Sequence, residues 1–283
     1  MAKRYEIPNA AWELVADIFT EYRRTGRPRT DDRLMLNGVL WVLCSGAAWR
    51  DMPERFGPWS TVYQRFRDWR NQGTFDQMLK RLHLKLNEKG MIDLKTWMID
   101  STAVRATRAS SGAGKRGGEE PQDHALGRSR GGLTTKIHML CDSNGIPLRF
   151  LLSGGNASDI TYAQPLLDGA SVPSLRGRPR KRCQWLLADK GYDAEALRKY
   201  CDRYRMRSVI PLRDMKRKPK PGLPRLFDRP KYRQRNIIER MFGWLKENRR
   251  IVTRFDKLAR SYAAMVSLAC SMRCLRQYFS YKA

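Results

Sequence analysis

The chain has 283 residues, 41% of them hydrophobic, which suffices for one or two folded domains and excludes a disordered arm. Its 56 Lys and Arg residues against 28 Asp and Glu leave a formal charge of +28, so a polyanion is the expected partner. The longest apolar stretch, residues 34–49, is interrupted by polar residues and falls short of the roughly 20 residues that span a bilayer, so we expect a cytoplasmic protein without membrane contact.

The first ninety residues are expected to be helical. Apolar residues follow helical spacing from about residue 12 to residue 86, and Gly57 and Pro58 mark a short turn before a basic helix. In that helix Val62, Phe66 and Trp69 form a stripe that should be buried, which leaves Thr61, Gln64 and Arg65 facing outward. Such a pattern resembles a helix-turn-helix, although an ordinary bundle with a solvated last helix is the alternative. Because the net charge favours DNA, residues 1–90 are predicted to be a DNA-binding domain.

The remainder, residues 91–283, changes to short β-rich runs that alternate with helices. A tight Asp-Ser-Asn-Gly turn joins the two strands of a hairpin. The expected strands lie at residues 96–104, 134–155 (the hairpin), 184–192 and 207–212, and the expected helices at 158–170 and 194–204. This order predicts an α/β sandwich with a mixed sheet.

Two segments, near 108–132 and 214–231, are too rich in Gly, Pro and charge to build a core and are predicted to be flexible loops. The tetrapeptide Gly-Arg-Pro-Arg occurs twice, at 26–29 and 177–180. Its arginines, Arg27, Arg29, Arg178 and Arg180, would suit a narrow A·T minor groove, but a plain basic loop is an equal alternative.

Two acids follow buried strands directly. Asp100 ends the apolar run Thr-Trp-Met-Ile, and Asp189 ends Trp-Leu-Leu-Ala. A single Asp in this position is usually a turn former or a helix cap. Two of them, on strands expected to be neighbours in so basic a chain, suggest instead a site for Mg²⁺, which prefers oxygen ligands and assists phosphodiester chemistry.

A third acid, Glu239, lies in a strongly basic stretch that is predicted to be helical. Helical geometry places Tyr232, Arg235 and Lys246 within about 40° of Glu239 around the helix axis, so the four side chains share one face. Glu239 would then bind a metal while its neighbours bind phosphates. The alternative is an amphipathic helix whose Glu only offsets nearby arginines.

These residues carry a resemblance to a known family. The spacing Y-(2)-R-(3)-E-(6)-K, met by Tyr232, Arg235, Glu239 and Lys246, resembles the signature of the DDE transposases of bacterial insertion sequences, in the superfamily named for insertion sequences four and five. The runs Met-Ile-Asp-Ser-Thr and Leu-Leu-Ala-Asp-Lys are similar to the contexts of the family's two catalytic aspartates, here Asp100 and Asp189.

The resemblance implies a ribonuclease-H-like core with Asp100 on the first strand, Asp189 after the fourth and Glu239 on a late helix. These acids would hold two Mg²⁺ ions, with Mn²⁺ as the alternative, and catalyse cleavage at the element's ends and joining of the 3′-hydroxyls to target DNA. Implied partners are the terminal inverted repeats, target DNA and further copies of the chain, on the bacterial nucleoid. A nuclease or resolvase of the same fold and a non-cleaving DNA-binding regulator are the competing hypotheses.

Overall fold

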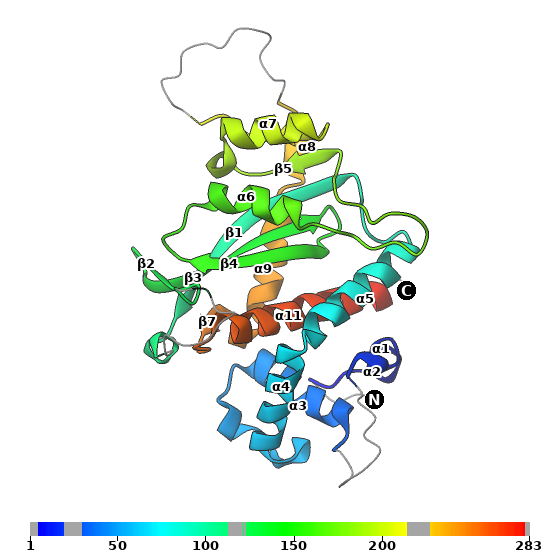
Figure 1. Cartoon of the computed structure of the whole chain (residues 1–283), viewed down its shortest axis with the longest axis vertical. Coiled ribbons are helices and arrows are strands. Elements are labelled where there is room, and N and C mark those ends of the chain that lie inside the picture. The colour runs from blue at the N-terminus through cyan, green and yellow to red at the C-terminus, as the bar shows by residue number, and fades with distance from the viewer. Residues whose placement is uncertain (1–4, 20–29, 113–120, 122, 214–226, 281–283) are drawn as a thin grey trace.

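The computed structural model describes residues 5–19, 30–112, 121, 123–213 and 227–280 (Figure 1). None of the helices in this part of the chain combines the length and apolar character needed to cross a membrane. The molecule has a helical N-terminal region and a mixed sheet with helices on both faces.

The N-terminal region is helical, as predicted. It contains α1 (Asn9–Glu13), α2 (Ala16–Phe19), α3 (Asp32–Ser45), α4 (Trp59–Asn71) and α5 (Thr74–Glu88), with two 3₁₀ turns, η1 (Trp49–Asp51) and η2 (Glu54–Phe56), before α4. The predicted stripe on α4 is confirmed, because Val62, Phe66 and Trp69 are all buried. The Trp69 ring meets Phe19 of α2 edge to face at 4.9 Å, which fixes α4 against the first helices.

A seven-stranded sheet forms the centre of the rest of the chain. Its strands are β1 (Thr96–Ala106), β2 (Gly127–Ser129), β3 (Gly132–Asp142), β4 (Pro147–Gly154), β5 (Trp185–Leu187), β6 (Arg207–Val209) and β7 (Thr253–Arg254). The path β2-β3-β1-β5-β6 carries β4 beside β3 and β7 beside β1. Because β1 is antiparallel to β3 and parallel to β5, the predicted mixed sheet is confirmed.

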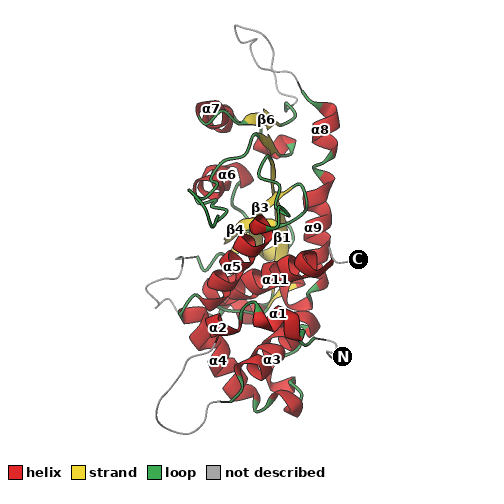
Figure 2. Ribbon diagram, turned by 90° about the vertical axis from the view of Figure 1, so that its right-hand side faces the viewer, coloured by secondary structure: helices red, strands yellow, loops and turns green. Residues whose placement is uncertain are grey.

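Helices cover the sheet on two sides (Figure 2). One face carries α6 (Asp159–Asp168) and α7 (Glu195–Arg203), and the other carries α8 (Arg229–Arg233) and α9 (Asn236–Glu247). On α9, Ile238, Met241, Phe242 and Leu245 are buried, as expected of an apolar stripe that docks on a sheet. The stripe therefore fixes how α9 presents its other residues.

The C-terminal helix joins the two halves of the molecule. After α10 (Arg249–Val252), helix α11 (Ala259–Ser280) runs alongside α5 (Figure 1). The Ser267 hydroxyl donates to Asp76 of α5 at 2.7 Å, and the Arg70 guanidinium of α4 donates to the Ser261 hydroxyl at 2.7 Å. Thus α11, whose sequence fits a partner surface equally well, contributes to the core.

The predicted loops and one strand need correction. Two short elements, the 3₁₀ turn η3 (Arg108–Ser111) and β2, lie inside the first range predicted to be a flexible loop, and α8 begins inside the second. Residues 113–120, 122 and 214–226 of those ranges lie outside the described residues. The strand expected at 184–192 ends at Leu187, because Asp189 caps a 3₁₀ turn, η4 (Lys190–Tyr192), by accepting the Gly191 N–H.

Candidate active site at the ends of two parallel strands

Asp100 on β1 and Asp189 after β5 stand at equivalent distances from the paired residues of these neighbouring strands. The last paired residues of β1 and β5 are Met98 and Leu187, and each acid comes two residues later. Parallel neighbours lie about 4.8 Å apart, so this register brings the two acids close together, with Asp100 inside β1 and Asp189 just beyond the carboxyl end of β5. The expectation that the strands are neighbours is confirmed.

Each aspartate is held by a backbone N–H at one oxygen. Asp100 Oδ1 accepts from Ser101 N at 2.8 Å, and Asp189 Oδ1 accepts from Gly191 N at 2.7 Å. Asp189 therefore also performs the capping role that is the ordinary reading of an Asp after a strand. The second oxygen of Asp100 accepts from Arg235 Nη1 at 3.0 Å.

Arg235 connects Asp100 to Glu239. Its Nη2 forms an ion pair with Glu239 Oε1, so one guanidinium binds two of the three acids. The side chains of Arg235 and Asp100 are each 18% exposed, whereas that of Glu239 is 55% exposed. Glu239 thus lies at the solvent side of the cluster, and Asp100 at its base.

The electrostatics of Asp100 reflect this crowding. Burial raises the pKa of Asp100 to about 6, and the negative charges of Asp189 and Glu239 act in the same direction. The Ser101 N–H and the Arg235 guanidinium oppose them, since both favour the charged carboxylate. Asp100 therefore experiences the charges of both other acids.

The donor chemistry of the three acids fits a hard divalent cation. Carboxylate oxygens are the ligands that Mg²⁺ prefers. Two of the three acids already bind a cation, the guanidinium group of Arg235. However, no group of three or more His, Cys, Asp or Glu side chains in the described chain is arranged as a finished metal site. The cluster is thus suited to the ion by its oxygens, while Arg235 pairs with Asp100 and Glu239.

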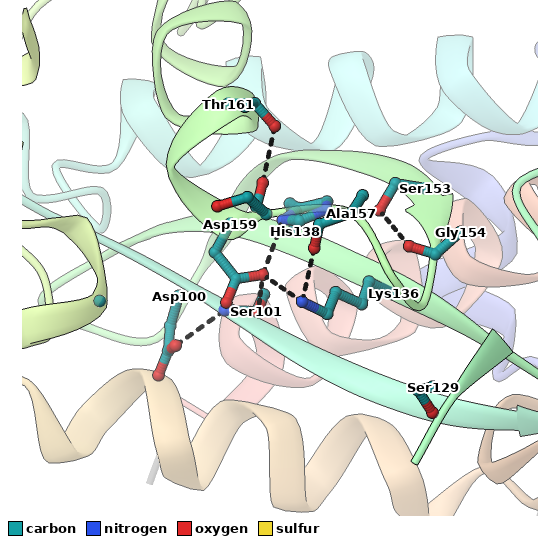
Figure 3. A network of polar contacts seen from close by, with 12 residues as sticks. Asp100, Ser101, Ser129, Lys136, His138, Ser153, Gly154, Ala157, Asp159 and Thr161 are labelled. Atoms are coloured by element: carbon teal, nitrogen blue, oxygen red, sulfur yellow. Dashed lines mark hydrogen bonds and ion pairs between the residues drawn. The ribbon is translucent and has the colours of Figure 1, made fainter. Parts of the chain in front are cut away.

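A polar network fixes the residue after Asp100 (Figure 3). Side chains alternate along a strand, so Asp100 faces α9 and Ser101 faces the opposite side, where α6 lies. The Ser101 hydroxyl donates to Asp159 Oδ1 at 2.8 Å, and Lys136 Nζ donates to the same oxygen at 3.0 Å. Tyr192 shares a hydrogen bond with Ser101. The network therefore connects the strand that carries Asp100 to α6 and η4.

His138 completes this network on β3, where it is paired across the strands with Ser101. Its ring stacks on Tyr162 with centroids 4.3 Å apart, and Nε2 lies 2.8 Å from Ser153 Oγ. Burial lowers the pKa of His138 to about 4, with the Lys136 charge acting in the same direction and Asp159 opposing. His138 is consequently neutral at neutral pH and serves the structure.

Sequence reasoning missed the role of Asp159. An acid in the first turn of a helix reads as a cap, and the pairing of Asp159 with Ser101 spans 58 positions. The available signal was on β3, where Lys136 and His138 interrupt an apolar strand at alternate positions. Two polar residues on one face of a buried strand need partners, but the sequence does not show which.

The residues predicted to share a helix face with Glu239 lie only partly on its helix. Tyr232 lies on α8 and not on the helix of Glu239, because the expected single helix is divided after Arg233. The break is slight, since Arg235 N still bonds Tyr232 O at 2.9 Å, and the Arg235 guanidinium lies 5.8 Å from the Tyr232 ring centroid. Lys246, in the last turn of α9, is partly exposed.

The residues predicted to face outward on α4 behave differently from one another. Gln64 is exposed and Thr61 partly exposed, and Gln64 Nε2 bonds Asp68 at 2.9 Å. Arg65 corrects the prediction, because its side chain is only 12% exposed and forms an ion pair with Asp32 of α3. Two helices that pack closely can bury such a pair, which helical spacing alone does not reveal.

The repeated Gly-Arg-Pro-Arg is described at its second copy only. Arg178 and Arg180 are exposed on the loop between α6 and β5, and the Arg180 backbone bridges to Val172. Arg27 and Arg29 lie outside the described residues. The second copy forms an exposed basic loop, and its predicted contact with DNA stays a prediction.

Comparisons with known proteins show the family to which the chain belongs. Residues 95–274 match the family described as "Transposase DDE domain", and residues 7–79 match "Putative transposase of IS4/5 family". A "Putative transposase for insertion sequence element IS402" from Burkholderia cepacia is 35% identical over 56% of this chain and 67% of its own length. A "Putative transposase for insertion sequence element IS6501" from Brucella ovis is 32% identical over 51% of this chain and its full length. No solved structure matches the chain.

Proposed function

Because the chain belongs to the family of transposases with a DDE domain, we propose that it cuts DNA at the ends of an insertion sequence and joins the freed 3′-hydroxyls to target DNA. The observation that carries this proposal is the convergence of Asp100 and Asp189 at one register of parallel strands, with Glu239 connected to Asp100 through Arg235. This acid cluster, Asp100, Asp189 and Glu239, is the proposed catalytic centre.

The acids would bind two Mg²⁺ or Mn²⁺ ions, which supply an activated water and stabilise the oxygen that leaves. Water attacks the phosphodiester at the element's end, and the bond from phosphorus to the 3′-oxygen breaks. The freed 3′-hydroxyl then attacks a target phosphodiester and releases a target 3′-hydroxyl. Asp100 would supply its carboxylate from within β1, Asp189 from the turn that follows β5, and Glu239 from α9.

The neighbouring basic residues would hold the DNA strand. In the described chain Arg235 forms ion pairs with Asp100 and Glu239. We propose that the same guanidinium exchanges these carboxylates for a DNA phosphate in the complex, beside Tyr232 and Lys246. Arginine suits both partners, because its planar fork matches carboxylate and phosphate alike.

The N-terminal helices would read the terminal repeats. We propose a helix-turn-helix in which α4 enters the major groove with Thr61 and Gln64, while Arg65 is held to Asp32 and positions the helix. Pairing two element ends requires at least two copies of the chain. The domain boundary near residue 90 and the ribonuclease-H-like topology belong to the same proposal.

One assay separates the three functional hypotheses. Labelled duplexes that carry the terminal repeats flanking the gene are incubated with the chain, a target plasmid and Mg²⁺. A transposase yields labelled plasmid, a nuclease or resolvase yields cut duplex without joining, and a regulator shifts the duplex in a gel and leaves it whole. We expect labelled plasmid, and its absence in the presence of tight binding would reject the proposal.

A further inference from the structure

We propose that a hollow between α9, α11 and the turn that joins β3 to β4 binds phosphates of the DNA strand as it passes the acid cluster. The inference rests on the proposed function and adds a binding site to it. The hollow has a volume of about 500 Å³. Its lining includes Asn144, Gly145, Arg240, Trp244, Arg273 and Arg276, and we call it the arginine hollow.

Positive charge dominates the arginine hollow. Three guanidinium groups line it against one carboxylate, that of Glu247. Arg240 and Arg276 are exposed, and their side chains form no hydrogen bond or ion pair with any described residue. Burial lowers the pKa of Arg273, and the charge of Arg276 acts in the same direction. The arginines therefore repel one another, and a bound anion would relieve that repulsion.

The base of the hollow is rigid. Arg273 Nε donates to Gly145 O at 3.3 Å, and Nη2 lies 3.5 Å from Asn144 O. The same guanidinium lies 5.9 Å from the ring centroid of Trp244, which packs against the core. Because backbone carbonyls and an aromatic ring hold Arg273, its charge is fixed before a ligand arrives.

The position of the hollow suits a strand that has passed the acid cluster. Arg240 follows Glu239 directly on α9, so the two side chains point about 100° apart around the helix axis. Arg240 and Trp244 are one turn apart, which aligns them along the helix beside the face of Glu239 and Lys246. A DNA strand that crosses the exposed side of α9 would contact the face of Glu239 first and the face of Arg240 next.

DNA suits this hollow better than an acidic protein segment. Guanidinium groups bind phosphate oxygens by paired hydrogen bonds, and the chain's charge of +28 already draws polyanions to the molecule. The hollow also adjoins the helix that carries Glu239, where the proposed function requires DNA. An acidic segment has no comparable reason to dock there.

The test compares two double variants of the full chain. Arg240→Gln with Arg276→Gln removes the two free guanidinium groups of the hollow. Lys199→Gln with Arg203→Gln removes the same charge from exposed positions on α7. Binding to a fluorescent 30-base-pair duplex of random sequence is measured by anisotropy at several salt concentrations with EDTA present, so that no DNA is cut.

Loss of two phosphate contacts should make the negative slope of log affinity against log salt shallower by about 1.8. It should also weaken binding about 30-fold at 0.15 M salt. We expect this for the hollow variant, while the control pair changes the slope by less than about 0.5. Equal effects of the two pairs would mean that only net charge matters, which overturns the inference.

Three further outcomes are distinguishable. If the hollow variant lost binding to a poly-glutamate peptide and kept the DNA slope, the hollow would serve an acidic protein and the inference would fail. If the hollow variant keeps the wild-type salt slope and still cuts terminal repeats in Mg²⁺, the role of the hollow in DNA binding is refuted and the proposed function stands. If the wild-type chain binds no duplex even at low salt, both fall together.

Discussion

The residue that follows Asp100 is held from the other side of the sheet. Ser101 donates to Asp159, which also accepts from Lys136, and Tyr192 joins at the Ser101 hydroxyl. The backbone N–H of Ser101 bonds one oxygen of Asp100 directly, so Ser101 helps to orient the carboxylate, together with Arg235 at the other oxygen. We therefore expect Asp159 to be a positioning residue, which acts on the proposed chemistry through Ser101.

This role predicts a specific pattern of rates. Ser101→Ala and Asp159→Ala should each slow single-turnover cleavage about 10-fold, equivalent to about 1.4 kcal/mol, with DNA affinity unchanged. The double variant should be no slower than either single one, because both remove the same link. Thr161→Ala is the matched control, since its hydroxyl bonds only Ser158 O within the same turn of α6. Additive losses, or a parallel loss of affinity, would contradict the role.

The sequence predicted some site residues well and others poorly, for a physical reason. Asp100 and Asp189 were predictable because an apolar run followed by an acid is a local pattern. The expected strand end at Asp100 was wrong, because β1 stays paired with β3 beyond Asp100 and continues to Ala106. The ion pair of Arg235 with Asp100 joins positions 135 residues apart, and that of Arg65 with Asp32 joins two helices. Such pairs depend on how elements pack, and no local spacing encodes them.

At the scale of elements, the N-terminal helices pack closely against the half of the chain that contains the sheet. Gly46 ends α3 with φ +71°, and a Cβ on it would lie 2.8 Å from the Arg249 Cβ of α10. Two demands thus fall on one residue: a left-handed backbone and room for a neighbouring chain. Only glycine meets both.

The two demands can be measured separately. Gly90→Ala tests the backbone alone, because Gly90 has φ +67° and nothing within 4 Å of the added Cβ, and it should cost about 1 to 2 kcal/mol of unfolding free energy. Gly46→Ala should cost about 1 to 3 kcal/mol more through overpacking. Urea unfolding checks both values. Equal losses would show that α10 yields to the added methyl group.

A buried histidine joins α5 to the sheet. His83 Nε2 lies 2.7 Å from Pro147 O of β4, and burial lowers the pKa of His83 to about 4 against the ordinary 6.5, although that hydrogen bond opposes the shift. Because the folded state binds the proton less readily than the unfolded chain, the contribution of His83 is complete above pH 6.5. It declines as the pH falls from 6.5 towards 4.

His83→Gln keeps a donor to Pro147 O and removes the titration. Between pH 7 and pH 4.5 the wild-type chain should lose about 2 to 3 kcal/mol more unfolding free energy than this variant. Urea unfolding at the two pH values gives the comparison, and the variant corrects for every other titrating group. Equal losses in both proteins would mean that His83 is accessible to protons in the folded chain.

Elements differ in how far the sequence predicts them. The hairpin of β3 and β4 was predicted because the Asn144-Gly145 turn is a strong signal, and Gly145 does adopt φ +72°. The two-residue strand β7 and the three-residue β2 were not predicted, since they exist only by pairing with β1 and β3. The break between α8 and α9 contains no Gly or Pro, so the sequence does not predict it.

At the scale of the whole molecule, the three acids of the proposed site lie in a strongly basic protein. The chain carries +28, yet Asp100 lies near enough to Asp189 and Glu239 to experience the charge of both. Basic side chains surround these acids: Arg235 within the cluster, Lys246 further along α9, and the arginine hollow beyond. A negative centre in a positive surface suits cations bound beside a phosphate backbone.

The most direct test of the acid cluster is Mg²⁺-dependent cleavage of a labelled terminal-repeat duplex by Asp100→Asn, Asp189→Asn and Glu239→Gln. Asn at 100 or 189 keeps an oxygen for the N–H of Ser101 or Gly191, so the fold should persist. Glu13→Gln, at an exposed acid on α1, is the control. We predict that each cluster variant binds the duplex normally and cleaves at least about 100-fold more slowly. Cleavage within about threefold of wild type by any one of them would remove that acid from the site and contradict a shared centre.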